Sequence, residues 1–431
     1  MVVLYVLAAL YKNRQSRSVV ELFGLSTSFP SSSSSSSSDL SLPAFKKFQR
    51  SFLLVYFLAM AADWMQGPYV YRLYAHYGFN RRENGILFIA GFGASLFFGT
   101  WVGPFTDMCG RRKACVMYGV VYTLSCATKQ INNFGVLIVG RLLGGVATSL
   151  LWSAFESWMI SEHFARGFDA ASLSHTFSLM SAGNGLVAVF SGLVAQCAAD
   201  TFQHPVAPFD VSAILLLLCI AIVLMQWTEN YGSVQSSIWG QMRDASMAVL
   251  RDSRVALTGL QQSFFEAGMY AFIFLWTPVL ESSGGDVPHG IVFASFMVAV
   301  SLGGMLFNLQ VERVVVCMPL VYIVAAITML VPAFANTELP NMMALTSFEL
   351  IVGFFWPCSA TLRAAYIPEE YRASVMSLFR APLNAIVCFL LYFQGYMGLQ
   401  ILFFLCTILH MGAALSAIRL KSSVKRHVTY V

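Results

Sequence analysis

The chain has 431 residues, of which 57% are hydrophobic and only 11% carry a charged side chain, and its mean hydropathy is +0.68. An average soluble domain is about 25% charged, so this chain has too little charge to cover a soluble surface. The composition therefore excludes a soluble enzyme and predicts an all-α protein that crosses a lipid bilayer many times. The net charge of +5 does not indicate nucleic acid, because the bases follow the membrane topology described below.

The first 45 residues contain no full membrane span. Residues 1–11 are apolar, but a spanning helix needs about 20 residues, and Lys12 and Arg14 follow this stretch, whereas a signal peptide has its bases in front. We expect a clipped or interfacial anchor there. Residues 26–42 hold a run of eight serines, which predicts a disordered linker.

Twelve apolar segments follow, and each is close to the length of a membrane helix. The first six are residues 51–73, 84–105, 114–132, 134–158, 171–198 and 206–227. The second six are residues 254–280, 289–309, 314–335, 341–362, 372–396 and 398–418. The sequence thus predicts two six-helix bundles, at 46–227 and 254–418, with a polar linker at 228–253 and a basic tail at 419–431.

Lysine and arginine are distributed unequally over the two sides of the predicted bundles. If residue 50 lies in the cytosol, 20 of the 26 bases fall on the cytosolic side, four outside and two within spans. The four outside are Arg72, Arg81, Arg82 and Lys129, and the two within spans are Arg141 and Arg380. Cytosolic loops are enriched in such bases, so we expect both termini in the cytosol.

The densest basic cluster is GPFTDMCGRRK, residues 103–113, in the predicted turn between the second and third spans. Any cytosolic turn collects bases, but that does not account for its glycines and its acid. Gly103, four residues after Gly99, predicts close approach of a neighbouring helix. Gly110 suits a tight turn with positive φ. Asp107 is placed to cap the third span or to meet a cation.

This stretch matches G-x-x-x-D-x-x-G-R-R-K at every position and resembles the loop 2–3 signature of the major facilitator superfamily. GRLLGGVATS, at 140–149, resembles the membrane arginine motif of the same family. The resemblance implies two six-helix parallel repeats that rock about a central site. It also implies a cytoplasmic latch formed by Asp107 and Arg111, with Arg112 in the same signature. Arg363, at the cytosolic end of the tenth span, is expected to be a gate or a snorkelling anchor.

Several longer strings read like the molybdate-anion transporter branch of this superfamily. They are VYFLAMAADWMQGPYVYRLYAHY, SAFESWMISEH, FLWTPVL and SLFRAPLNA, and the likeness covers most of residues 45–420. The resemblance, not residue chemistry, implies a molybdate cargo and a plasma-membrane location. The chain has no Cys/His spacing typical of metal sites and no phosphate-binding loop, so we expect no cofactor and no enzymatic activity.

Six ionisable side chains stand within predicted spans: Asp63, Arg141, Glu156, Glu266, Glu349 and Arg380. Each isolated charge at mid-helix costs about 2.5–3.5 kcal/mol. Single pairs between arginines and acids would simply lock helices together. Two bases cannot neutralise four acids, however, so the surplus acids are expected to face water or to hold a proton.

We expect Arg141 and Arg380 to bind a tetrahedral dianion through their guanidinium forks. Asp63 and Glu266 occupy equivalent positions in the two halves, 203 residues apart. Our hypothesis is that one of them takes up a proton as the anion enters, which would couple transport to H⁺.

Four further residues complete the expected site and its supports. Glu156 and Glu349 are expected to be structural partners of the buried charges. Trp64, next to Asp63, is the aromatic side chain expected near the site, together with Phe265. Two alternatives remain open at this point: a carrier of another anion or a small organic solute, and a receptor or scaffold with the same fold that transports nothing.

Overall fold

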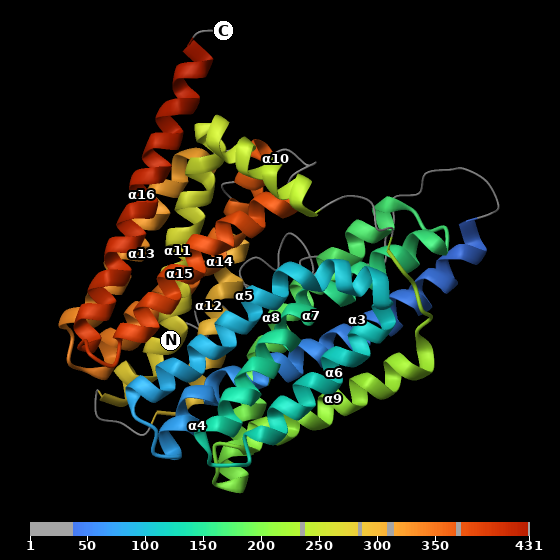
Figure 1. The fold of residues 1–431 in the computed structure, drawn as a ribbon, viewed down its shortest axis with the longest axis horizontal. Helices are drawn as coiled ribbons and strands as arrows, with labels where there is room; N and C mark the ends of the chain where they lie inside the picture. Colours follow the sequence, from blue (N-terminus) through green and yellow to red (C-terminus); the bar gives the residue numbers. More distant parts are fainter. Residues whose placement is uncertain (1–37, 233–237, 283–286, 308–313, 368–371, 430–431) are drawn as a thin grey trace, which may run out of the picture.

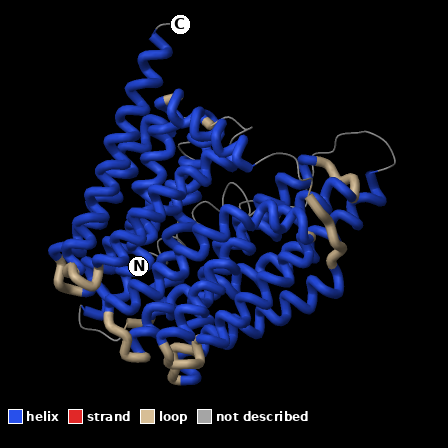
Figure 2. Tube along the Cα trace, in the orientation of Figure 1, coloured by secondary structure: helices blue, strands red, loops and turns tan. Residues whose placement is uncertain are grey.

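The structure is a computed structural model that describes residues 38–232, 238–282, 287–307, 314–367 and 372–429. Within these ranges the chain consists of helices and short connections and contains no strand (Figure 2). The anchor expected at residues 1–11 and most of the serine run lie outside the described residues.

Twelve long helices account for the predicted spans in the described part of the chain. The first six are α3 (Ser38–Gln66), α5 (Arg81–Cys109), α6 (Arg111–Thr128), α7 (Phe134–Ala165), α8 (Ala170–Phe202) and α9 (Ala207–Gln226). The second six are α11 (Ser253–Ser282), α12 (His289–Phe307), α13 (Val314–Phe334), α14 (Glu338–Tyr366), α15 (Arg372–Phe393) and α16 (Leu399–Thr429). Three short helices are η2 (Gly67–Tyr69), α4 (Val70–His76) and α10 (Ile238–Arg251).

By length and composition alone, eight of these described helices could cross a membrane, or nine if the bent α5 is counted as one span. The others, α3, α6 and α15, carry charged residues near one end or inside the apolar stretch, which lowers their hydropathy.

Three boundaries differ from the sequence prediction. Helix α3 already begins at Ser38, so residues 38–42 are helical and the disordered linker expected there is wrong. The first predicted span ends its regular helix at Gln66, because Pro68 lacks the N–H that would continue the ladder. Helix α16 runs on to Thr429, so most of the expected tail extends the last helix.

The helices pack as two bundles with the same arrangement, which confirms the predicted repeat. In the first half α5 packs on α7, α7 on α6, α6 on α9 and α9 on α3. The second half repeats this order as α12 on α14, α14 on α13, α13 on α16 and α16 on α11. Two seams join the halves, α8 with α12 and α15 with α5, and the repeat relates one seam to the other.

The two ends of the molecule differ in how the halves meet. We call the end with the Gly110 turn, α10 and Thr429 the linker end, and the opposite end, with α4, the far end (Figure 1). The bundles lean apart toward the linker end and converge at the far end (Figure 1). Contacts between the halves gather at the far end; for example, the N–H of Gly290 donates to Gln196 Oε1 at 2.9 Å.

Glycines set the closest helix approaches within each half. A Cβ on Gly303 of α12 would lie 1.9 Å from the carbonyl oxygen of Leu350, and one on Gly353 of α14 would lie 1.9 Å from that of Val300. In the first half, a Cβ on Gly145 of α7 would lie 2.4 Å from the carbonyl oxygen of Gly91. The α12–α14 and α5–α7 pairs are related by the repeat, so both halves use backbone contact at the same place.

Candidate functional site

Asp63 lies in a polar cluster inside the first half, here called the first cluster: Asp63, Tyr122 and Arg141, the last of which is near enough to act electrostatically on Tyr122. The Tyr122 hydroxyl donates to Asp63 Oδ1 at 2.6 Å. Arg141 Nε donates to the carbonyl oxygen of Leu87 at 3.1 Å, and its guanidinium lies 4.9 Å from the centre of the Phe88 ring. A neutral carbonyl and an aromatic face orient this cation without neutralising its charge.

Glycine makes the space that Arg141 occupies. A Cβ on Gly91 would lie 2.5 Å from Arg141 Nη2, so a larger residue there would displace the guanidinium. Because Gly91 is on α5 and Arg141 on α7, the close packing of these two helices also fixes the position of the charge.

Glu266 lies in a corresponding network inside the second half, here called the second cluster: Gln262, Glu266, Ser359 and Arg363. Gln262 Nε2 donates to Glu266 Oε1 at 2.7 Å. Arg363 Nη1 donates to Ser359 Oγ at 2.9 Å and to Gln262 Oε1 at 3.3 Å. Gln262 therefore connects an acid on α11 to a base near the linker end of α14.

Arg380 projects from α15 as an exposed side chain. It is close enough to act electrostatically on Glu266 and on Tyr270, both on α11. The Tyr270 ring packs edge-on against Phe92 of the first half, with ring centres 5.3 Å apart. Arg380 thus lies beside the surface where the two halves meet.

Two aromatic pairs cross between the halves near both clusters, and we call them the aromatic seal: Phe88, Phe92, Tyr270 and Phe274. Phe88 contacts Phe274 with ring centres 5.1 Å apart, and Phe92 contacts Tyr270 as described above. Phe88 carries Arg141 on its face and Tyr270 lies near Arg380. Arg141 thus contacts the seal directly, and Arg380 of the other half is near enough to act on it electrostatically.

Within the described residues, the six charged side chains in the spans form no ion pair with one another. The ion pairs found there involve Arg72, Arg111, Arg166, Arg254 and His289 instead. The interpretation in which Arg141 and Arg380 lock helices together through acids is therefore wrong for this conformation.

The two other acids do not support the buried arginines. Glu349 is only 7% exposed on α14, and Glu156 is exposed on α7, near Tyr56. Neither makes an ion pair among the described residues, so their expected role as partners of Arg141 and Arg380 is wrong in this conformation. For Glu156 the reason is geometric, because it follows Arg141 by fifteen residues on the same helix, which places it about 22 Å away along the axis.

The two aromatic residues expected near the site, Trp64 and Phe265, have different surroundings. Trp64 Nε1 donates to Asn184 Oδ1 at 2.8 Å, which joins α3 to α8, and its ring contacts Phe293 of the other half at 6.0 Å. Phe265 is completely buried in the second half, where it stacks on Phe355 at 4.0 Å, so it is a core residue.

The signature turn is tied to its own half. Arg111 Nε and Nη2 donate to Asp107 Oδ1 at 2.8 and 2.7 Å, and Arg111 Nη1 donates to the carbonyl oxygen of Ser157 on α7 at 3.2 Å. Gly110 has φ of +102°, as predicted for a tight turn. The prediction for Gly103 is wrong here, because a Cβ at this position would meet no atom within 4 Å.

The acid that caps α6 is Glu229, which was not among the residues predicted from the sequence. Its carboxylate accepts from the backbone N–H of Arg112 at 2.9 Å and of Lys113 at 3.3 Å. Arg112 in return donates through Nη2 to the carbonyl oxygen of Leu224 at 2.7 Å, near the end of α9. The available signal was an acid directly after an apolar span, on the same side as a basic turn.

We expect Glu229→Ala to lower the free energy of unfolding by about 1–2 kcal/mol, because α6 would lose a charged cap at its N-terminus. The apparent melting temperature of the purified protein measures this change. Glu338→Ala is the matched control, since Glu338 lies in the first turn of α14 without a side-chain cap at that terminus. Equal melting temperatures for the two variants would contradict the cap.

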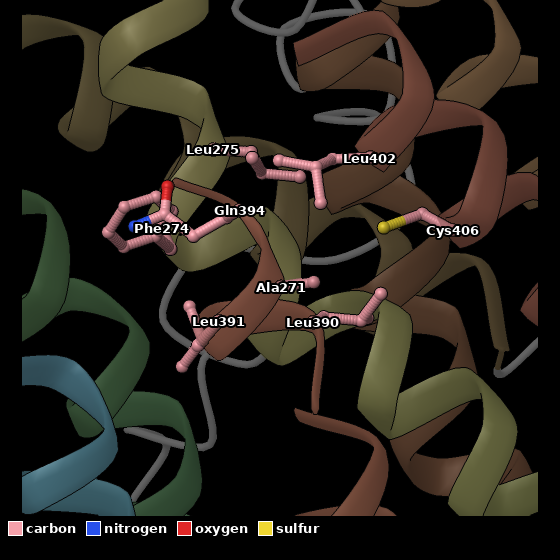
Figure 3. A pocket seen from close by; sticks show the side chains of 8 residues that line it. All are labelled: Ala271, Phe274, Leu275, Leu390, Leu391, Gln394, Leu402 and Cys406. Carbon is pink, nitrogen blue, oxygen red and sulfur yellow. The ribbon is translucent and has the colours of Figure 1, made fainter. Parts of the chain in front are cut away.

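A small cavity in the second half is not suited to an anion. It lies between α11, α15 and α16, and Figure 3 shows its lining, which apart from Gln394 and Cys406 consists of hydrocarbon side chains. It has room for about one water molecule. The cavity offers no cation to a charged ligand, unlike the neighbourhood of the aromatic seal.

Comparison with known proteins gives concordant results. Residues 18–354 match the family model MFS_5, described as sugar transporters with 12 membrane spans. A molybdate-anion transporter from Xenopus tropicalis is 38% identical over 408 residues, covering 91% of this chain and 90% of the relative. A protein of the same name from Danio rerio is 33% identical over 381 residues, covering 80% and 79%.

Solved transporters have the same fold. The nucleoside transporter NupG superimposes with a TM-score of 0.68 at 12% identity, over 86% of this chain and 98% of that structure. The POT family transporter PepTSo gives a TM-score of 0.70 at 10% identity, over 88% and 98%. Family model, relatives and fold agree, and the chain is a member of the major facilitator superfamily.

Proposed function

We propose that this protein is a secondary transporter that carries molybdate across the membrane by alternating access. The family model is described as sugar transporters. The relatives that are 33–38% identical over most of their length are instead named molybdate-anion transporters. We give more weight to the relatives, because a cargo with two negative charges agrees with the site.

The observation that carries this proposal is a pair of arginines, one from each half, that form no ion pair with an acid among the described residues. Arg141 lies on a ring of the aromatic seal and Arg380 acts electrostatically on another, and a planar guanidinium is suited to tetrahedral oxyanions. A dianion between them would attract both halves at once. Binding would thereby favour closure at the linker end and prepare the far end to open.

From the charge bias we infer that the linker end, with both described ends of the chain, faces the cytosol. The structure would then be the inward-open state, because the halves diverge at that end (Figure 1). Asp107 and Arg111 contact their own half here and would join the other half when the carrier faces outward, with Arg363 opposite as a gate. We place the protein in the plasma membrane.

Uptake of labelled molybdate in a molybdate-starved host tests the proposed cargo. We expect uptake above that of cells without the protein, stronger competition by tungstate, the closest analogue, and weaker competition by sulfate. Full competition by a neutral sugar, or no uptake by protein that is present at the cell surface, would overturn the proposal.

We expect uptake to rise as the external pH falls, because a proton on Asp63 or Glu266 would remove negative charge near the entering anion. Asp63→Asn or Glu266→Gln, whichever residue carries the proton, should flatten the pH profile. Glu349→Gln is the control, since Glu349 is also a span acid but belongs to neither cluster. Unchanged pH profiles for Asp63→Asn, Glu266→Gln and the double variant would remove the coupling hypothesis.

A further inference from the structure

The few bases on the sparsely charged side of the membrane have a common structural role. Four bases interrupt the charge bias: Arg72, Arg81, Arg82 and Lys129. Three of them, the arginines, contact the second half across the boundary between the bundles. The fourth, Lys129, is buried within the first half. Bases are normally enriched on the cytosolic side of a membrane protein. The contacts with the second half explain why three arginines lie on the opposite side.

Arg72 makes the ion pair of this group. Its Nη1 lies 3.4 Å from Glu281 Oε1, at the far end of α11, and His289 Nε2 lies 3.1 Å from the same oxygen. Tyr69 packs against the His289 ring from the first half, with ring centres 5.9 Å apart. A carboxylate of the second half is thus approached by a cation of the first half.

Arg81 and Arg82 act at the seam between α5 and α15. Arg81 Nη2 donates to the carbonyl oxygens of Gln394 and Met397, each at 3.3 Å, and Gln394 Nε2 donates back to the carbonyl oxygen of Arg81. The Arg82 guanidinium lies 5.2 Å from the centre of the Tyr396 ring. These partners lie in the turn after α15, where carbonyl groups have no partner within the helix.

We propose that Arg72, Arg81 and Arg82 form a far-end clasp, which holds the halves together while the linker end is open and must release before the far end opens. This inference rests on transport by alternating access. An ion pair or hydrogen bond between the bundles shifts the balance between the inward-open and outward-open states only if it exists in one of them and not in the other. The clasp contacts join elements from both halves, so they are lost when those elements separate.

Hydrogen–deuterium exchange of the full chain in lipid nanodiscs, without substrate, tests the clasp. In Arg72→Gln we expect faster exchange in far-end peptides and slower exchange around Gly110, because the population shifts toward the state open at the far end. The shift should be about two- to fivefold, the range for a partly exposed ion pair. Glu281→Gln removes the same pair from the other half and should shift the same peptides in the same direction.

Arg254→Gln is the matched control. Arg254 pairs with Asp252 at 2.8 Å and its side chain is 40% exposed, against 43% for Arg72, but this pair lies within one half. Exchange that is accelerated equally at both ends in Arg72→Gln would indicate lost stability instead of a shifted equilibrium and would overturn the clasp. The double variant Arg72→Glu with Glu281→Arg should restore the wild-type pattern.

This experiment separates the clasp from the proposed cargo. Opposite changes at the two ends in a protein that takes up no molybdate would support the clasp and contradict the cargo. The clasp alone would be overturned by a different result. The protein would take up molybdate, but Arg72→Gln and Glu281→Gln would exchange hydrogen for deuterium at the same rates as Arg254→Gln.

Discussion

Arg141→Ala is expected to reduce molybdate uptake at least tenfold at equal surface expression. The substitution removes a guanidinium that forms no ion pair among the described residues and contacts the Leu87 carbonyl oxygen and the Phe88 ring. Loss of one partner of a desolvated, hydrogen-bonded charge pair costs about 2–5 kcal/mol. Initial uptake rates across a range of molybdate concentrations would measure the effect.

Arg141→Lys distinguishes charge from geometry. Lysine keeps the positive charge but loses the planar fork, and its shorter reach would change the contact with the Leu87 carbonyl oxygen and the Phe88 face. We expect intermediate uptake with a raised KM. Arg254→Ala, which removes an arginine outside both clusters, should transport as the wild type does. Full activity of Arg141→Ala would exclude this residue from the anion site.

Gly353→Ala is expected to have the largest effect on stability. A Cβ there would lie 1.9 Å from the Val300 carbonyl oxygen, and that atom belongs to the backbone of α12, so no side-chain rotation can relieve the overlap. Overpacking of this kind costs about 1–3 kcal/mol or more. We expect a clearly lower melting temperature in detergent, or little folded protein.

Gly304→Ala provides a neighbouring comparison on the opposite helix. A Cβ on Gly304 would lie 3.8 Å from the Gly353 carbonyl oxygen, which is ordinary contact, so the melting temperature should stay close to that of the wild type. Equal destabilisation by both substitutions would mean that helix propensity, not close packing, decides the outcome.

The sequence determined the fold to a large extent because the membrane allows few solutions. Apolar segments about 20 residues long have to be helices, and their number and the interrupting linker predict two equal halves. The start of α3 at Ser38 was missed, since a serine run has the composition of a linker although its last residue can open a helix. Composition alone does not distinguish the end of a linker from the first residue of a helix.

The site was predictable at the level of individual charges but not of their partners. Asp63, Arg141 and Glu266 stand out because charges in apolar segments are rare. Their hydrogen-bond partners Tyr122, the Leu87 carbonyl oxygen and Gln262 come from other turns or other helices, and neutral partners of this kind leave no charge signal in the sequence. Balancing acids against bases therefore led to the wrong pairs for Glu156 and Glu349.

The length of the last helix has a practical consequence for imaging this protein. With 31 residues α16 is about 46 Å long, while the hydrocarbon core of a bilayer is about 30 Å thick. It projects beyond its neighbours at the linker end (Figure 1). A soluble domain fused through an uninterrupted helical junction would be carried at a fixed angle, and could serve as an alignment marker in electron cryomicroscopy of a 47.5 kDa chain.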